Sequence, residues 1–197
     1  PLGQQYEEHL SALRRKWEGC LGVPYFQDYT CTYAPLPRLR ELYEQALALP
    51  GAVGLHIATR ADCLPEPVLD LLSEINGRTH LVVELGLQTV HDETARRIGR
   101  GHDYAAFLRG YESLNSRGIR VCVHIINGLP GEDREMMLET ARELARLHAF
   151  SVKIHLLHIM RGTRLADWYA AGEFSEMSLE DYASTVVSQL ELLPPDT

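Results

Sequence analysis

The chain has 197 residues, of which 45% are hydrophobic and 23% charged, enough for one sizeable core in a globular domain. Its formal net charge of −8 disfavours broad electrostatic binding to nucleic acid or to an anionic membrane. No apolar run approaches the ~18 residues of a membrane span, so we expect no membrane partner.

The four cysteines are not spaced like a zinc site or a dense disulfide framework. Cys20, Cys31, Cys63 and Cys122 stand 11, 32 and 59 residues apart. Thiols used in this way are typical of a reducing compartment, and we expect the protein to be cytoplasmic.

Apolar residues recur at helical spacing in some stretches and at strand spacing in others. Helices are predicted over 4–17, 35–47, 65–76, 91–98, 103–118, 134–147, 163–171 and 178–193. Strands are predicted over 23–29, 53–58, 81–88, 119–126 and 152–158. Thr89 and Asp103 are the expected caps of the two helices that follow them.

Strands that alternate with helices indicate right-handed crossovers and a parallel sheet. Five strands fall short of a closed eight-stranded barrel. No linker divides the chain, so residues 1–197 are expected to form one α/β domain. Because the first helix has no strand before it, we expect that one strand is missing at the amino end.

The central strand ends in the sequence ELGLQT, residues 84–89. Alternation places Glu84, Gly86 and Gln88 on one face and leucines on the other. Polar groups at the carboxyl end of a parallel strand suggest a ligand site, because ligands bind at that end in parallel α/β folds. A polar turn that satisfies local backbone groups is the alternative.

Polar residues also share a register near the ends of the neighbouring strands. These pairs are His56 and Arg60, Cys122 and His124, and Lys153 and His155. One buried histidine is usually a satisfied core residue, but packing alone would rarely bring so many polar groups together. The pattern therefore favours a ligand cavity.

Two further features lie between strands and helices. The sequence GLPG at 128–131 allows a ligand to approach the backbone closely, although a tight turn explains it equally well. Arg100 stands between two glycines and could grip a carboxylate, or it could be a solvated surface residue.

Several of these motifs occur together in one family. Their order resembles that in radical S-adenosylmethionine (SAM) enzymes, most closely a bacterial group of iron–sulfur oxidoreductases related to the Elongator catalytic subunit and oxygen-independent coproporphyrinogen oxidase. The motifs are TRADCL at 59–64, ELGLQT at 84–89, GRGHD at 99–103, GLPGE at 128–132, KIHLLH at 153–158 and GT at 162–163.

The resemblance implies a partial (β/α)6 barrel of the TIM type, with SAM lying across the carboxyl ends of the strands. Gln88 and His124 match residues that meet the ribose of SAM, and Arg100 matches the arginine that grips its carboxylate. Ile126 matches a residue that packs on the adenine, and Glu84 and Gly128 belong to the same binding motifs.

The family also uses a [4Fe–4S] cluster held by C-x-x-x-C-x-x-C, a spacing that this chain lacks, so no metal ligand is expected here. We expect the chain to begin just after the family's first strand and cluster loop. Related enzymes often carry a carboxylate near the position of Ala58, so contact with the SAM amino group either comes from Glu84 or is lacking.

The implied function of the whole protein is reductive cleavage of SAM to methionine and a 5′-deoxyadenosyl radical, which abstracts hydrogen from a substrate. An electron donor such as flavodoxin or ferredoxin is the implied partner. The Elongator kinship leaves transfer RNA open as a substrate, although the acidic charge argues against nucleic acid. This chain alone is expected to bind SAM without cleaving it.

Two other functions remain open from the residues. The first is a cluster-free sensor or scaffold that binds SAM or a nucleotide. The second is a (β/α) lyase or isomerase that uses Lys153, His155 and Glu84 for acid–base chemistry.

Overall fold

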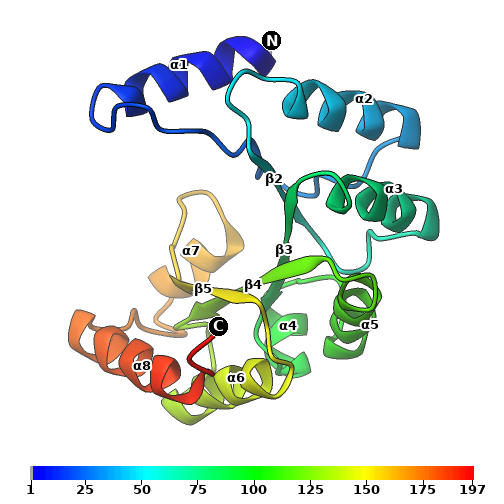
Figure 1. The fold of residues 1–197 in the computed structure, drawn as a ribbon. Helices are drawn as coiled ribbons and strands as arrows, with labels where there is room; N and C mark the ends of the chain where they lie inside the picture. The colour runs from blue at the N-terminus through cyan, green and yellow to red at the C-terminus, as the bar shows by residue number, and fades with distance from the viewer. Residues whose placement is uncertain (1) are drawn as a thin grey trace. The chain divides into compact units, whose positions relative to one another are not determined.

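The computed structural model describes residues 2–197, which form eight helices and five strands (Figure 1). The helices are α1 (Leu2–Arg14), α2 (Leu36–Leu47), α3 (Glu66–Asn76), α4 (Asp92–Arg97), α5 (Tyr104–Asn115), α6 (Arg134–Arg146), α7 (Arg164–Ala170) and α8 (Leu179–Leu192). The strands are β1 (Tyr25–Phe26), β2 (Gly54–Thr59), β3 (His80–Gln88), β4 (Arg120–Asn127) and β5 (Ser151–Leu156).

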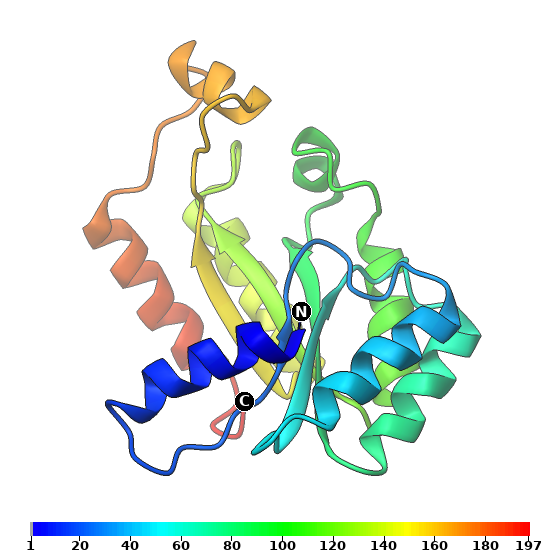
Figure 2. The same ribbon diagram turned by 90° about the horizontal axis from the view of Figure 1, so that it is seen from above.

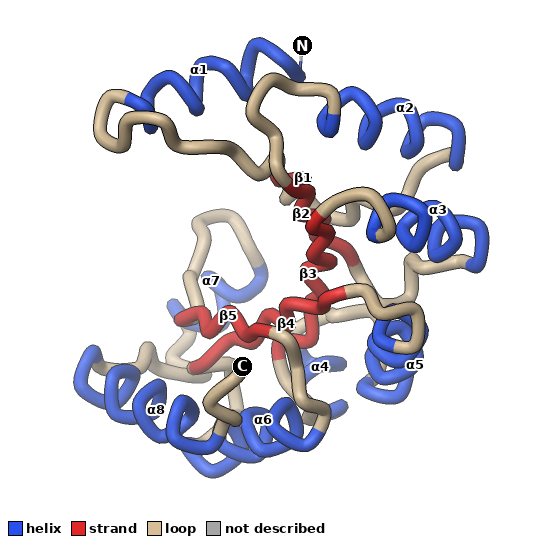
Figure 3. Tube along the Cα trace, in the orientation of Figure 1, coloured by secondary structure: helices blue, strands red, loops and turns tan. Residues whose placement is uncertain are grey.

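The strands form one sheet in chain order, β1-β2-β3-β4-β5. The pairs β1–β2, β2–β3 and β4–β5 are parallel, as the alternation of strands and helices predicted. Figure 3 shows the last of these pairs, β4 and β5, running side by side. The carboxyl ends of paired strands therefore lie together, which is the arrangement that the predicted ligand site requires.

The chain divides into two compact units. The first consists of Pro1–Leu85 and Gly110–Val121, and the second of Gly86–Arg109 and Cys122–Thr197. In the first unit α2 and α3 lie side by side (Figure 2). Their buried faces carry Leu39, Tyr43 and Ala46 from α2 and Val68, Leu69, Leu71, Leu72 and Ile75 from α3.

In the second unit α6 packs on α8. The side chain of Asp133 begins α6 by accepting the Met136 N–H at 2.9 Å, and Ser178 begins α8 by accepting the Asp181 N–H at 3.0 Å. The buried amide of Gln189 on α8 bonds reciprocally to that of Asn127 at the end of β4, at 2.8 and 2.9 Å. This amide pair satisfies polar groups that would otherwise be stranded in the core.

Three sequence predictions need correction. The strand predicted over 23–29 pairs only at 25–26, because Pro24 has no N–H to donate and Tyr29 adopts a left-handed backbone with φ of 55°. Thr89 does not cap α4: the cap position is His91, and the Thr89 hydroxyl accepts the His91 N–H in a local turn. The first helix, predicted over 4–17, runs from Leu2 to Arg14, and although its Leu10 is buried, its Leu13 is 46% exposed.

Asp103 does cap α5 as predicted, because its carboxylate accepts the Ala106 N–H at 2.8 Å. No helix within residues 2–197 is both long enough and apolar enough to cross a membrane.

We predict that Gln189→Ala lowers the free energy of unfolding by about 2–4 kcal/mol, since it leaves the buried Asn127 amide without its partner. Urea denaturation followed by circular dichroism measures the loss. The matched control is Gln45→Ala, which removes an exposed amide bonded to Glu41 and should change stability by less than about 0.5 kcal/mol. Equal losses in the two variants would show that the buried amide pair is not stabilising.

Candidate functional site

The predicted site residues fall in both units, and each unit is described by itself. Glu84 lies in the first unit, on β3. The other five lie in the second unit: Gln88 on β3, Arg100 after α4, His124 and Ile126 on β4, and Gly128 in the following loop.

Glu84 is a fully buried carboxylate in the middle of a polar network. Its side chain is 0% exposed, and it accepts hydrogen bonds from the Tyr25 hydroxyl at 2.6 Å and from His56 Nδ1 at 2.8 Å. A buried carboxylate is tolerated only when it is bonded in this way. The alternative of a polar turn is therefore wrong for Glu84, which is held inside the sheet by β1 and β2.

Tyr25 was not among the predicted site residues. It stands 59 residues from Glu84 in the chain, and only the parallel pairing of Tyr25 with His56 places both beside the carboxylate. The only indication of Tyr25 in the sequence was its place in the strand predicted over 23–29, which is rich in aromatic residues.

Gly86, Gln88 and Arg100 form a tight polar cradle in the second unit. The Arg100 guanidinium donates to the Gly86 carbonyl at 2.6 Å. A Cβ at residue 86 would lie 2.8 Å from Gln88 Nε2 and 2.9 Å from Arg100 Nη2. Both side chains can therefore approach the strand only because residue 86 is glycine.

The cradle holds an amide oxygen that the protein does not satisfy. Gln88 Oε1 is buried and has no hydrogen-bond partner among residues 2–197. Such an oxygen needs a donor, because an unpaired buried polar atom costs about 1–3 kcal/mol. A ligand with hydroxyl groups and a carboxylate, as SAM has, would satisfy the oxygen and bind the guanidinium. The cradle thus fits SAM.

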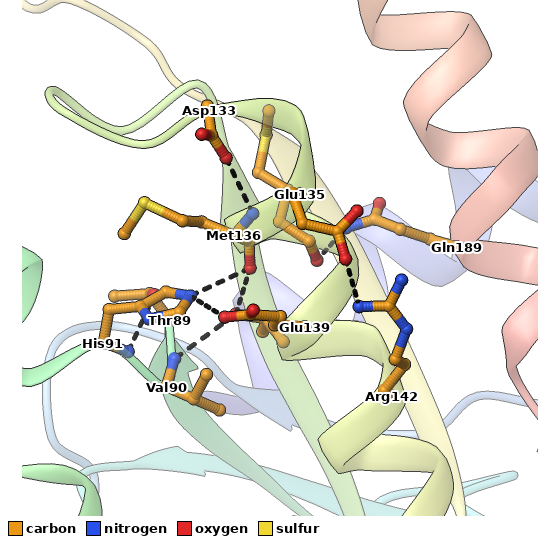
Figure 4. A network of polar contacts seen from close by, with 11 residues as sticks. Thr89, Val90, His91, Asp133, Glu135, Met136, Glu139, Arg142 and Gln189 are labelled. Carbon is orange, nitrogen blue, oxygen red and sulfur yellow. Dashed lines mark hydrogen bonds and ion pairs between the residues drawn. The ribbon is translucent and has the colours of Figure 1, made fainter.

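The turn after Gln88 is fastened to α6 (Figure 4). Gln88 has a left-handed backbone with φ of 69°, which is uncommon for a residue with a side chain. His91 Nε2 lies 3.0 Å from the Met136 carbonyl oxygen, and the Val90 N–H donates to the Thr140 hydroxyl at 3.4 Å. These bonds hold the turn that aims the Gln88 amide.

The residues of β4 alternate as predicted. Val123, Ile125 and Asn127 are buried, while His124, Ile126 and Gly128 are half-buried. His124 Nδ1 lies 3.3 Å from Nε2 of His155 on β5, so two of the predicted polar positions meet. Gly128 has a φ of 84°, a conformation that favours glycine, and its N–H donates to the Met137 sulfur at 3.3 Å.

Glu132 is the last residue of the loop that begins at Gly128. Its side chain links this loop to the stretch that follows Gln88. The pKa of its carboxyl is raised by burial, and hydrogen bonds from the hydroxyls of Thr89 and Thr94 offset part of that rise. Glu132 therefore connects the two stretches of the second unit that carry predicted SAM ligands.

The cysteines do not fit an iron–sulfur cluster. Cys20, Cys31 and Cys63 are half-buried and Cys122 is buried, and none of the four forms a disulfide among residues 2–197. Cys20, Cys31 and Cys63 belong to the first unit and Cys122 to the second, and their spacing differs from the family's motif. These four residues therefore cannot hold the family's cluster.

Two family models match the chain. That of the radical SAM superfamily matches residues 7–144, and that of the Radical_SAM C-terminal domain matches residues 150–197. The first match covers well over half of the chain, so the chain belongs to the radical SAM superfamily. SAM and a [4Fe–4S] cluster are the cofactors of this superfamily, as the sequence resemblance implied.

Curated relatives match most of the chain. YtqA of Bacillus subtilis is 48% identical over 192 residues, which are 98% of this chain and 60% of YtqA. Human Elongator complex protein 3 is 30% identical over 154 residues, which are 76% of this chain and 27% of the human protein. The chain thus spans less than two thirds of the length of these relatives.

Solved structures share the fold. Elp3 of Methanocaldococcus infernus matches with a TM-score of 0.66 and 24% identity, over 80% of this chain and 37% of Elp3. Coproporphyrinogen III oxidase (HemN) of Escherichia coli, a radical SAM enzyme, matches with a TM-score of 0.60 and 16% identity, over 82% of this chain and 37% of HemN. The predicted α/β class with a partial TIM-type barrel is confirmed, because both structures share this fold.

We predict that Glu132→Gln stabilises the protein at neutral pH. Because burial raises the pKa of Glu132 on folding, its protonated form favours the folded state. That contribution is full below the pKa of the unfolded chain and is lost as the pH rises through the folded pKa, so the advantage of the amide should grow between about pH 4 and pH 7.

Thermal unfolding of wild type, Glu132→Gln and Glu191→Gln at several pH values measures this effect. Glu191 is exposed on α8 and serves as the control. A stability difference between Glu132→Gln and wild type that does not change with pH would contradict the assignment.

Proposed function

We propose that residues 1–197 are the SAM-binding core domain of a radical SAM enzyme. The observation that carries the proposal is the cradle at Gly86, where the unsatisfied Gln88 oxygen and the Arg100 guanidinium crowd onto β3. The cradle offers an acceptor and a cation side by side, which matches a ligand that carries both hydroxyl groups and a carboxylate.

The site residues take the following roles in this proposal. Arg100 binds the carboxylate of SAM, because its planar guanidinium suits bidentate contact with a carboxylate. Gln88 and His124 bind the ribose hydroxyls, and Ile126 packs on the adenine. The Gly128 backbone approaches the ligand closely, and Glu84 belongs to the same binding motif.

For the whole protein, we propose the superfamily's reaction: reductive cleavage of SAM to methionine and a 5′-deoxyadenosyl radical that abstracts hydrogen from a substrate. The electron would come from a donor such as flavodoxin or ferredoxin. No step is assigned to the four cysteines of this chain. The substrate stays open, and transfer RNA modification is supported only by the kinship with Elongator complex protein 3.

A second function stays open beside the first. A SAM-binding sensor or scaffold without radical chemistry would use the same cradle. A lyase or isomerase built on Lys153 and His155 has less support, since His155 contacts the His124 imidazole. The setting we propose is cytoplasmic and reducing, in keeping with four cysteines that form no disulfide among residues 2–197.

Calorimetric titration of this chain with SAM tests the proposal. Arg100→Ala should weaken binding about 10–100-fold, the range expected when a charged hydrogen bond to a carboxylate is lost. The control Arg38→Ala removes an exposed guanidinium paired with Glu41 and should leave the affinity unchanged. No SAM binding by the wild type, or equal affinities in all three proteins, would overturn the proposal.

Gly86→Ala separates binding from folding. The new methyl group meets only the flexible ends of Gln88 and Arg100, so stability should change by less than about 1 kcal/mol while SAM affinity falls about tenfold or more. Gly77→Ala is the control, because its Cβ finds ordinary contact distances at the end of α3. Unchanged affinity in Gly86→Ala would show that the cradle does not hold SAM.

A further inference from the structure

A cavity of about 500 Å³ lies within the second unit, beside the loop that follows β4. Residues 128–132 form one wall, and residues 173–177 with the first half of α8 form the other. Its size is in the range of small-molecule sites. Apart from Gly128, the residues that line this cavity have no role in the proposed binding of SAM.

A buried hydroxyl lines this cavity without a partner. Thr185 on α8 is 1% exposed, and its Oγ1 has no hydrogen-bond partner among residues 2–197. A threonine within a helix commonly bonds to the carbonyl one turn back, and Thr140 on α6 does so with Met136. Thr185 makes no such bond, so its hydroxyl is available to whatever fills the cavity.

The charged groups that line the cavity are mostly acidic. Its carboxylates belong to Glu132, Glu173, Glu176 and Asp181, and Arg134 supplies a guanidinium to the lining. Arg97, behind the lining, pairs with Glu173 at 3.8 Å, which leaves an acidic excess. The Arg134 guanidinium already donates to the Ser188 hydroxyl at 2.8 Å. Glu132 Oε1 is buried and has no partner among the described side chains. Acceptors that lack donors, with an excess of negative charge, suit a cation that carries N–H groups.

The remaining lining is apolar and adaptable. It includes Met137, Met177 and Phe174. Methionine side chains fill irregular space and re-pack readily around a guest. A ligand with a short apolar body would therefore find contacts beside the acceptors.

We propose that this cavity binds a small organic cation, a primary ammonium group on a short apolar chain, with the ammonium donating to Glu132 and Thr185. The inference stands on the cavity's own residues and does not require SAM to bind. Gly128 borders the cavity and also belongs to the loop assigned to SAM, and a Cβ there would meet Met177 Cγ at 3.1 Å.

Titration with butylammonium, followed by the backbone amide NMR signals of α8, tests the proposal. The neutral probe of the same length is 1-butanol. Butylammonium should bind about tenfold more tightly than 1-butanol, as expected for a charged donor that meets buried acceptors. Equal affinities for the two probes would overturn the proposal.

Thr185→Val is the decisive variant, because it keeps the side-chain shape and removes only the hydroxyl. It should weaken butylammonium binding about fivefold while the thermal midpoint stays the same or rises, since the lost hydroxyl was unpaired. Glu132→Gln should weaken butylammonium about tenfold and leave 1-butanol unchanged.

Ser184→Ala, an exposed change on the same helix, is the matched control and should have no effect. Unchanged butylammonium affinity in Thr185→Val would overturn the assignment. Displacement of butylammonium by excess SAM would also overturn it, because the cation would then share the SAM site.

Discussion

The close approach of two side chains to β3 at Gly86 is the constraint on which the candidate site depends. Any Cβ at this position would push away the Gln88 amide or the Arg100 guanidinium. The left-handed backbone of Gln88 and the bonds from the following turn to α6 hold the amide in place. The strained backbone of Gln88 is thus held by α6, which is bonded to the turn after this residue. Strained residues held in this way are typical of binding sites.

The buried polar groups of the chain fall into two kinds. Glu84 and the Asn127–Gln189 pair are satisfied by protein partners, so they explain how polar residues are tolerated in the core. Gln88 Oε1, Glu132 Oε1 and Thr185 Oγ1 are buried and lack partners among residues 2–197. A ligand would gain the most binding free energy at the second kind, because each of these atoms has lost its contact with water without gaining a hydrogen-bond partner.

Much of the fold could be predicted from the sequence, because the spacing of apolar residues records which face of each element is buried. The helix from 65 to 76 and the strands around Val83 and Val123 are examples. The extent of β1 could not be predicted, because it depends on pairing across the sheet and on the backbone of Tyr29. The prediction that Thr89 caps α4 was wrong, because the Thr89 hydroxyl accepts the His91 N–H in a local turn.

For the candidate site, residue types and order predicted Gln88, Arg100 and His124, but no local pattern predicted the contacts around Glu84. Tyr25 and His56 reach Glu84 through strand pairing across 59 and 28 residues, which no local pattern records. The crowding at Gly86 is likewise a property of three-dimensional packing. The unpaired hydroxyl of Thr185 gave no sequence signal, since a threonine at that position of an amphipathic helix is unremarkable.

The most direct test of the account compares SAM with decarboxylated SAM, which lacks the carboxylate assigned to Arg100. Wild-type chain should bind SAM at least about tenfold more tightly than the decarboxylated ligand, and Arg100→Ala should bind both with equal, weak affinity. Equal affinity of the wild type for the two ligands would contradict the central claim that the cradle at Gly86 holds the carboxylate of SAM.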